Sequence, residues 1–449
     1  MVLYLQEFAV PNGTPLRMTE LTDFPTKPNL NVETPPSPVD SVEQSAAIAD
    51  AKAHRLRTLV ILSLLMAFAS ISTDLYLPAL PGMAESLHAD AGTLEYTISG
   101  YLVGFSLGQL VWGPIGDRFG RKLPISAGLL LFVLGSAGCA LSTDAHTMIM
   151  WRAFQAVGAC ASVVLARAMV RDLYTGVRSA QMMSTLITVM AIAPLIGPSV
   201  GGVILHLASW RAIFWTLVGV GLFTLLALTV LPETLPRERR NHEPLRQAFV
   251  AYGTLLRSWR LLGYAGAGGF FYGGIYAYIA GTPFAFITYH HVSPQGYGLL
   301  FAAGIVGIMV TNQLNARYVR HWGSDNIMCA GAVAAASSGV AVALSSLTDF
   351  GGVAGLVAPL FVFVSLNGFI VANSIAGAMG IFPTRTGAVS ALIGSIQYGT
   401  GIAGSAVVGA LANGSPFPMG LVIALMGIGS AVSALVLKNL SRGSKHSVH

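Results

Sequence analysis

Two charged side chains stand inside long apolar stretches of this sequence. Counting Asp, Glu, Lys and Arg, Asp74 is the only charged residue of 58–84 and Arg152 the only one of 145–166. A carboxyl group in a partly dry environment has a raised pKa and can bind and release a proton near neutral pH. An arginine in such a setting needs a partner, and its charge can favour release of that proton. We therefore predict that Asp74 carries a proton and that Arg152 acts on it.

The sequence leaves a structural alternative for each of these residues. If the apolar stretches are membrane helices, Asp74 lies near the end of its helix and could be a solvated acid at the membrane surface. Arg152 could extend its side chain to the lipid headgroups. Elimination favours Asp74 as the proton carrier, because the second half offers only Asp325 and Asp349, both in predicted turns. Whether Asp74 and Arg152 meet in space does not follow from the sequence.

The composition indicates that the apolar stretches are membrane helices. Of 449 residues, 54% are hydrophobic and 10% are charged, whereas soluble domains carry roughly 25% charged residues. So few charges cannot cover a water-facing surface, which excludes a soluble enzyme and a nucleic-acid-binding module. The three cysteines lie in apolar runs and fit neither a disulfide framework nor a metal site. No nucleotide-binding P-loop occurs, which argues against ATP-driven transport.

The lengths of the apolar stretches predict the number of membrane spans. A spanning helix needs about 20 apolar residues, and three long stretches of the second half each hold two such helices around a turn: 261–316, 326–384 and 386–437. Six further spans are expected at 56–79, 96–115, 123–142, 147–170, 181–205 and 211–231. The predicted fold is therefore an all-α integral membrane protein with twelve transmembrane helices in two pseudo-symmetric six-helix bundles.

The segments outside the bundles complete the predicted organisation. The bundles cover 56–232 and 260–438, with a cytoplasmic linker at 233–259 and a cytoplasmic tail at 439–449. Residues 1–55 are expected to be a disordered cytoplasmic tail, because their first 50 residues hold seven prolines and seven acids without helical periodicity.

The positions of the basic residues predict the orientation in the membrane. Turns on one side and the central loop carry nearly all of the arginines and lysines between the spans, whereas the opposite turns carry only Arg211. Basic residues mark the cytoplasmic side. This places both termini of a multi-pass membrane protein in the cytoplasm, and it explains the net charge of +6 without a nucleic-acid partner.

The turn after the second predicted span combines glycines with one acid and three bases. Its residues are Gly113, Asp117, Arg118, Gly120, Arg121 and Lys122. Such a cluster can form a charge network that holds one conformation and releases another, or it can be an ordinary basic turn. The string GxxxDRxGRK resembles the signature loop of the major facilitator superfamily, as does the twelve-span layout. A weaker copy at 316–323 has Arg320 where the first copy has Asp117.

Span five carries a run of prolines and glycines that resembles the antiporter motif found in exporters of that superfamily. The run comprises Pro194, Gly197, Pro198, Gly201 and Gly202. Two upstream glycines of the family pattern are replaced, by Ser184 and Ala193. A kinked packing helix is the alternative interpretation.

The string D-x-Y-LPALP at 74–81 and the RAxVRDLY run at 167–174 resemble the Bcr/CflA branch, the bicyclomycin and chloramphenicol resistance exporters. The resemblance implies a monomeric proton-coupled antiporter of the bacterial inner membrane that exports small drugs such as bicyclomycin or chloramphenicol-type compounds. It implies no cofactor, because the proton gradient supplies the energy. The alternatives are a symporter or exporter of a metabolite such as an amino acid, peptide or osmolyte, and, more remotely, a polytopic membrane enzyme or sensor.

The substrate cavity is expected near the membrane midplane between the two bundles. Candidate lining residues are Tyr101, Gln155, Tyr272, Tyr276, Asn367 and Gln397. Because no second acid lies within a predicted span, neutral or zwitterionic cargo is favoured over strongly cationic dyes. His290 and His291 are interpreted as a polar turn, so no metal site is expected.

Overall fold

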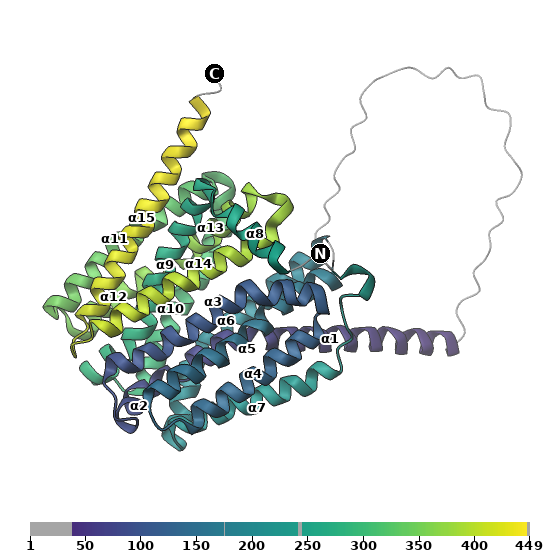
Figure 1. Ribbon diagram of the computed structural model, residues 1–449, viewed down its shortest axis with the longest axis horizontal. Coiled ribbons are helices and arrows are strands. Elements are labelled where there is room, and N and C mark those ends of the chain that lie inside the picture. The colour runs from purple at the N-terminus through teal and green to yellow at the C-terminus, as the bar shows by residue number, and fades with distance from the viewer. Residues whose placement is uncertain (1–37, 175, 241–244, 447–449) are drawn as a thin grey trace, which may run out of the picture. The chain divides into compact units, whose positions relative to one another are not determined.

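The computed structural model describes residues 38–174, 176–240 and 245–446, and the regular elements in these ranges are helices. Residues 55–449 form one compact unit, and residues 1–54 form a separate unit. The description below concerns the larger unit, shown as a ribbon in Figure 1. An all-helical chain is what the composition predicts for a membrane protein, because helices satisfy their backbone hydrogen bonds internally.

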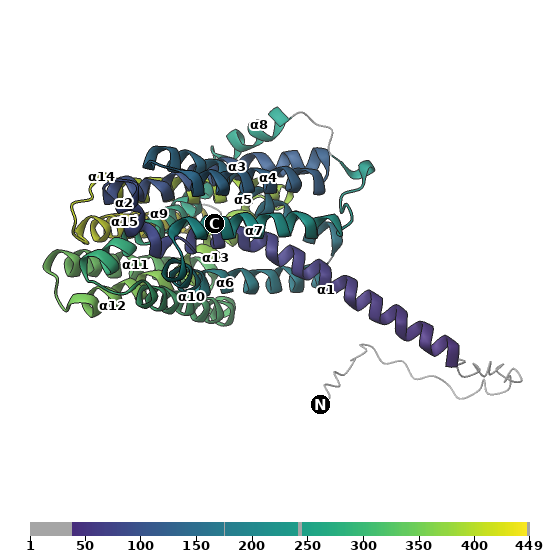
Figure 2. The same cartoon turned by 90° about the horizontal axis from the view of Figure 1, so that it is seen from below.

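The first half of the chain contains eight helical elements. They are α1 (Pro38–Asp74), the 3₁₀ turn η1 (Leu77–Ala79), α2 (Leu80–Ser86), α3 (Ala91–Phe119), α4 (Lys122–Leu141), α5 (Ala145–Leu173), α6 (Gly176–Leu207) and α7 (Trp210–Thr229). The segment between the halves holds η2 (Arg237–Arg239) and α8 (Leu245–Leu255). Helix α8 packs against α3 and α14 and lies on the outside of the bundle in Figure 2.

The second half begins with α9 and ends with α15. Its elements are α9 (Trp259–Pro283), the π-helical turn η3 (Phe284–Tyr289), α10 (Pro294–Trp322), α11 (Ser324–Thr348), α12 (Gly352–Ser365), α13 (Asn367–Ile381), η4 (Pro383–Arg385), α14 (Thr386–Ala410) and α15 (Phe417–His446). The predicted turns near 290 and 414 are thus found between helices. The span predicted before residue 384 is divided at Leu366 into α12 and α13.

Ten helices of the described ranges are long and apolar enough to cross a membrane. The predicted spans 96–115 and 181–205 fall on α3 and α6, which are not among these ten; only Ile192–Leu207 of α6 counts as a shorter apolar helix. Helix α3 carries several buried polar side chains, including Ser99, Ser106 and Gln109, which lower its hydropathy. The all-helical membrane fold is confirmed, and the count of twelve spans stays a prediction.

Two elements begin elsewhere than the sequence suggested. Helix α1 starts at Pro38, within the predicted tail, and its first turns contain strong helix formers such as Ala, Glu and Gln. The remainder of the predicted tail, 1–37, lies outside the described residues. Asp325, predicted in a turn, lies in the first turn of α11, where its carboxylate accepts a hydrogen bond from the Tyr264 hydroxyl at 2.7 Å.

Aspartate side chains fix where two helices of the first half begin. Asp90 accepts a hydrogen bond from the backbone N–H of Thr93 at 2.8 Å, and Asp144 accepts one from Thr147 at 2.9 Å. These contacts satisfy N–H groups that have no partner inside the helix. The hydroxyl and N–H donors of the two threonines hold the pKa of both carboxyl groups below the ordinary value.

The two halves contact each other through α3 with α14 and through α6 with α10. The hydroxyl groups of Ser99 and Ser405 lie 2.8 Å apart, and those of Ser106 and Ser395 lie 3.0 Å apart. Small polar residues let helices approach closely and hydrogen-bond across their contact. These neutral contacts join two helical bundles that are otherwise packed within themselves.

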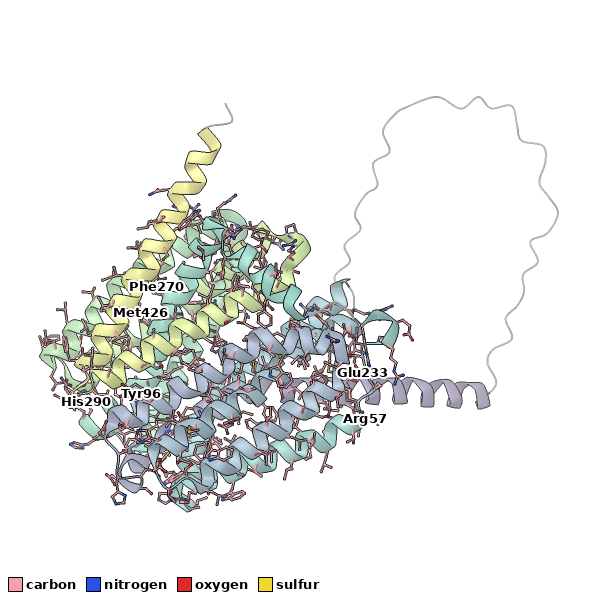
Figure 3. All side chains as sticks on the ribbon, in the orientation of Figure 1. Arg57, Tyr96, Glu233, Phe270, His290 and Met426 are labelled. Atoms are coloured by element: carbon pink, nitrogen blue, oxygen red, sulfur yellow. The ribbon has the colours of Figure 1, made fainter. Side chains whose placement is uncertain are left out.

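The two ends of the larger unit differ in charge. Figure 3 shows Glu233 at one end and Tyr96 and His290 at the other. We call the first the basic end, because Arg118 and Arg121 lie there in the α3–α4 turn. We call the second the opposite end.

Candidate functional site

Asp74 is the last residue of α1, and its side chain is buried, with an exposed fraction of 4%. Its Oδ1 accepts a hydrogen bond from the Thr73 hydroxyl at 3.2 Å. No ion pair with a described basic side chain accompanies it. The interpretation of Asp74 as a solvated rim acid therefore does not fit this structure, and a buried carboxyl without a counter-charge is best accommodated when protonated.

Glycines of α6 enclose Asp74. A Cβ atom on Gly197 would lie 3.0 Å from the Asp74 Cβ, and one on Gly201 would overlap the Leu75 carbonyl oxygen. The end of α1 and η1 can therefore press directly against the α6 backbone. The acid and the proline–glycine run, which sequence reasoning treated as separate features, form one site.

The Arg152 side chain is fully buried on α5, with an exposed fraction of 0%. Its Nη1 donates to the Ser72 carbonyl oxygen at 3.0 Å and to Gln155 Oε1, while the guanidinium lies 4.2 Å from the centre of the Tyr76 ring and 4.4 Å from that of Tyr101. Two aromatic faces thus supply the partners that a buried cation requires. The interpretation of Arg152 as extending to headgroups does not fit this structure.

No Asp74–Arg152 ion pair forms in the conformation described. Arg152 instead binds the carbonyl oxygen of Ser72, two residues before Asp74 in the last turn of α1. Gln155, predicted to line the substrate cavity, connects Arg152 to α4 by donating to the Ser136 hydroxyl at 2.7 Å. Arg152 therefore touches the helix turn that carries the acid, and its predicted effect on the proton stays a prediction.

A charge network occupies the basic end of the first half. The Arg121 Nη1 lies 2.7 Å from Asp117 Oδ1, and its Nε lies 2.8 Å from Asp172 Oδ2. Only 7% of the Arg121 side chain is exposed. Paired charges in this semi-buried position tie the α3–α4 turn to the end of α5.

Glu233 extends this network to the segment after α7. It accepts hydrogen bonds from the backbone N–H groups of Arg121 at 2.8 Å and Lys122 at 3.1 Å. Partial burial works against its charge, yet these N–H donors, that of Leu235 and nearby Arg240 hold the pKa of Glu233 below its ordinary value. Lys122 Nζ in turn donates to the Leu231 carbonyl oxygen at 2.7 Å. All residues of the network belong to the first half or to the segment directly after it, so it does not join the two halves here.

The remaining residues of the predicted switch loop have different environments. Gly120 has a φ of +92°, a conformation that favours glycine. Gly113 has open space around its Cβ position, so no close approach of another helix requires a glycine there. Arg118 is exposed and lies 5.7 Å from the ring of Phe119.

A cavity of about 230 Å³ lies at the basic end between α3, α5, α8 and α14. Its walls combine arginines with small and polar residues: Gln109, Gly113, Pro114, Asp117, Arg121, Val164, Arg167, Ala168, Arg171, Tyr252, Gly387, Ala388, Ser390 and Ala391. Both halves contribute, as expected for a substrate path. None of the six residues predicted to line the substrate cavity belongs to this lining.

Three of those six residues belong instead to an aromatic cluster deeper between the halves. Tyr272 and Tyr276 have ring centres 6.0 Å apart, and each lies within 6.0 Å of Tyr398. Tyr398 also lies 4.6 Å from Phe105, which stacks on Tyr101. Sequence reasoning missed Tyr398 and Phe105, since neither the hydropathy pattern nor a motif distinguishes them from packing aromatics.

The other two predicted lining residues lie apart from that cluster. Gln397 is buried against α9, where a Cβ on Gly268 would lie 3.1 Å from its Nε2. Asn367 is half-buried at the start of α13.

The fold and this site define a class of protein. Two helical bundles meet along small-residue contacts and enclose a cavity between them, and the first bundle buries an acid and an arginine that form no ion pair with each other. This is the architecture of a multi-pass secondary transporter, in which sites lie between repeated bundles.

The comparisons with known proteins identify the family. The family model for the Major Facilitator Superfamily matches residues 62–406, and the chain belongs to that family. It is 33% identical over 394 residues to an uncharacterized MFS-type transporter, YdgK, of Bacillus subtilis (strain 168), covering 87% of this chain and 96% of the relative.

Two further relatives have resistance names. The chain is 31% identical to a bicyclomycin resistance protein homolog of Haemophilus influenzae, covering 81% of this chain and 90% of that protein. It is 29% identical to a chloramphenicol resistance protein of Pseudomonas aeruginosa, covering 86% and 92% of the two chains. These matches confirm the resemblance to the bicyclomycin and chloramphenicol resistance branch.

Solved structures agree on the fold. The nucleoside transporter NupG matches with a TM-score of 0.67 at 13% identity, covering 85% of this chain and 98% of that one. The xylose transporter XylE from E. coli matches with a TM-score of 0.64 at 15% identity, covering 86% and 97%. The family match and the transporter-named relative indicate that the chain is a transporter.

We expect Gly201→Ala to destabilise the site around Asp74. The added methyl group overlaps the Leu75 carbonyl oxygen, and overpacking of this kind costs about 1–3 kcal/mol. The variant should melt at lower temperature in detergent and transport more slowly. Gly219→Ala on α7 is the matched control, because open space surrounds its Cβ position. Equal melting temperatures for the two variants would contradict the close packing of α6 on α1.

We expect Asp172→Asn to weaken the charge network. It removes one of the two carboxylates that hold the buried Arg121 side chain, and hydrogen bonds to charged groups contribute about 1.5–3 kcal/mol. Thermal melting of the purified protein should show a transition several degrees lower than that of the unaltered chain. Glu238→Gln, in the exposed turn η2, should leave the melting temperature unchanged. Identical melting temperatures for Asp172→Asn and Glu238→Gln would contradict a stabilising role of the charge network.

Proposed function

We propose that this protein is a proton-coupled secondary active exporter of small drugs, of the kind that bicyclomycin and chloramphenicol represent. The observation that carries the proposal is the buried Asp74 carboxyl, which has no ion-pair partner among the described residues. The residue that carries it packs through its Cβ atom against Gly197 of the α6 motif. The names of the relatives support drugs as the cargo. The basic end supports a cytoplasmic location for both termini in the inner membrane of a bacterium, and we propose that the protein acts as a monomer.

The proposed cycle uses the two protonation states of Asp74. Cargo enters from the cytoplasm through the cavity at the basic end, whose walls come from both halves. The neutral acid fits the dry contact between α1 and α6, whereas the ionised acid favours a conformation in which water reaches it. Loss of the proton to the cytoplasm therefore changes the relative stability of the two conformations, and export of cargo follows from the rearrangement.

Arg152 sets the position of the acid in this proposal. It holds the Ser72 carbonyl oxygen and lies between the rings of Tyr76 and Tyr101. A shift of the last turn of α1 would bring its unpaired Nε and Nη2 atoms closer to a carboxylate. Opposite charges within about 4–6 Å favour the ionised form of an acid, so this shift would promote proton release.

The cavity gives a second candidate function some support. It carries Arg167 and Arg171 beside neutral polar side chains, which also suits a metabolite with a negatively charged group. Export or symport of such a metabolite is therefore the alternative, and a transport assay with both kinds of compound separates the two.

The test is substrate-triggered proton movement in everted membrane vesicles. Neutral antibiotics of the bicyclomycin and chloramphenicol types should cause proton release from energised vesicles that contain the protein. We expect Asp74→Asn to abolish this response, because a side-chain amide neither binds nor releases a proton near neutral pH. Asp144→Asn is the control: asparagine caps a helix as well as aspartate does, so its response should persist.

Two results would contradict the proposal. Proton release that survives Asp74→Asn would exclude Asp74 as the carrier. A response to acidic metabolites and to none of the drugs would favour the alternative cargo.

A further inference from the structure

A second acid is buried between the two halves, at the opposite end from the basic cavity. Glu95 lies in the second turn of α3, and its exposed fraction is 3%. Within the described ranges, its side chain has no hydrogen bond or ion pair, and its Oε2 is buried without a partner. Glu95 directly precedes the span predicted at 96–115.

Glu95 lies where α3 of the first half meets α14 of the second. A Cβ on Gly92 would overlap the Gly409 carbonyl oxygen, and a Cβ on Gly409 would lie 3.5 Å from the Glu95 Cβ. One turn further along α3, the Ser99 hydroxyl lies 2.8 Å from that of Ser405. The two halves are thus in direct contact around Glu95, and this contact closes the opposite end in the conformation described.

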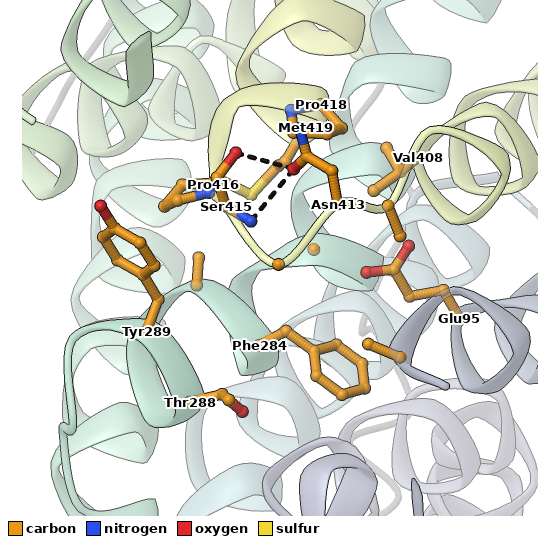
Figure 4. Close-up of a pocket in the computed structure, with 15 residues that line it drawn as sticks. Glu95, Phe284, Thr288, Tyr289, Val408, Asn413, Ser415, Pro416, Pro418 and Met419 are labelled. Carbon is orange, nitrogen blue, oxygen red and sulfur yellow. Dashed lines mark hydrogen bonds between the residues drawn. The ribbon is translucent and has the colours of Figure 1, made fainter. Parts of the chain in front are cut away.

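A small pocket of about 70 Å³ adjoins the Glu95 side chain. Figure 4 shows Glu95 on one side of it, with Phe284 and Asn413 on others. The lining also includes Val408, Pro416, Pro418 and Met419 from the second half. The walls are mostly apolar, so they solvate a neutral carboxylic acid far better than a carboxylate.

The ionisable groups near Glu95 do not compensate a negative charge. Asp90 on the same helix is itself an acid, and Tyr289 of η3 lines the pocket as a phenol. From α2 and the turn after it come Glu85 and His88, both exposed. The wall formed by 408–419 contains no ionisable residue. At that end His290 pairs with Asp349, with 3.8 Å between Nε2 and Oδ1.

We propose that Glu95 is a second proton-binding site, which must be protonated for the contact between α3 and α14 to close. With Glu95 neutral, the apolar contact forms at no electrostatic cost. With Glu95 ionised, closing would bury an uncompensated charge, so the halves separate until water reaches the carboxylate. Opening therefore releases a proton to the solution at this end, and a rise in the pH of that solution favours the open conformation.

This inference deepens the proposed function, on which its place in the cycle rests. An outward-open exporter that has released its cargo would return only after a proton from outside binds Glu95. Asp74 and Glu95 would then act at successive points: Glu95 controls closure of the outer contact, and Asp74 responds to the cytoplasmic side.

The test is thiol accessibility of the closed contact as a function of external pH. Val408→Cys introduces a reporter at a position that is 2% exposed, in the full chain in intact cells with a membrane-impermeant maleimide outside. The three native cysteines are buried, and their labelling without the reporter is subtracted. Every labelling rate is divided by the rate of the same maleimide with free cysteine at that pH, because the reactive thiolate fraction itself rises with pH. We expect this normalised rate to rise about tenfold between about pH 6 and about pH 9, because the closed contact buries Glu95 and burial keeps a carboxyl group neutral to higher pH than in water.

Variants of the acid make the test specific. Glu95→Gln should keep the labelling rate low at every pH, whereas Glu95→Asp should retain the rise. Glu85→Gln removes an exposed acid from the same end and should behave as the unaltered chain does. Ser99→Cys reports from α3 if the Val408 variant does not fold. A pH-independent labelling rate in the Val408→Cys chain with Glu95 intact would overturn the inference. So would an unchanged rise after Glu95→Gln is added to that chain.

The outcome is distinguishable from a failure of the proposed function, because labelling requires neither drug nor transport. Flat labelling in a chain with Asp74-dependent proton release overturns the role of Glu95 alone. If Asp74→Asn rather than Glu95→Gln removes the pH-dependent rise, the gate responds to Asp74 and the inference is wrong. Glu95-dependent labelling without drug-triggered proton release supports the gate and contradicts only the drug exporter.

Discussion

The cost of burying charge governs this structure. Asp74, Glu95 and Arg152 are each at least 96% buried, since their exposed fractions are 4%, 3% and 0%, and none has an ion-pair partner in the described ranges. Each of the two acids loses its charge when it binds a proton, whereas an arginine stays charged because its guanidinium is not deprotonated in proteins. Arg152 accordingly receives two aromatic rings, a carbonyl oxygen and a glutamine oxygen, while the acids receive little. The uneven supply of partners separates a permanent charge from two that can be switched.

Close packing makes that burial possible. Glycine at 197 and 201 lets the end of α1 press on α6, and glycine at 92 and 409 lets α3 press on α14. In both places a buried acid lies at the point of closest approach between helices. How far bulk water reaches each acid therefore depends on whether its contact is closed, so the protonation state of each acid is coupled to that contact.

The sequence predicted the helical membrane fold, the family and the acid Asp74, because these depend on composition, run lengths and local strings. It did not reveal that Glu95 is buried, since a residue at the edge of an apolar stretch is buried only by the helix that crosses it. Tyr398 and Phe105 were missed because, in the sequence, they look like any packing aromatic residue, and only the packing of helices from both halves brings them together. Whether Asp74 and Arg152 meet was left open by the sequence, because it depends on how two helices are turned toward each other. In the structure, Arg152 reaches the backbone two residues before the acid.

The strength of the contacts differs between the inside of a bundle and the contact between bundles. The ion pairs of Arg121 and the hydrogen bonds of Glu233 connect α3, α4 and α5 with the segment after α7, all on one side of the central contact. Across the contact, the described hydrogen bonds are between neutral groups, such as the serine pairs at 99–405 and 106–395. Neutral hydrogen bonds contribute only about 0.5–1.5 kcal/mol each, and charged ones about 1.5–3 kcal/mol. A pKa difference of one unit between two conformations corresponds to about 1.4 kcal/mol, which is comparable to one of these neutral hydrogen bonds. The charged loop therefore stabilises the packing within the first half and not the contact between the halves.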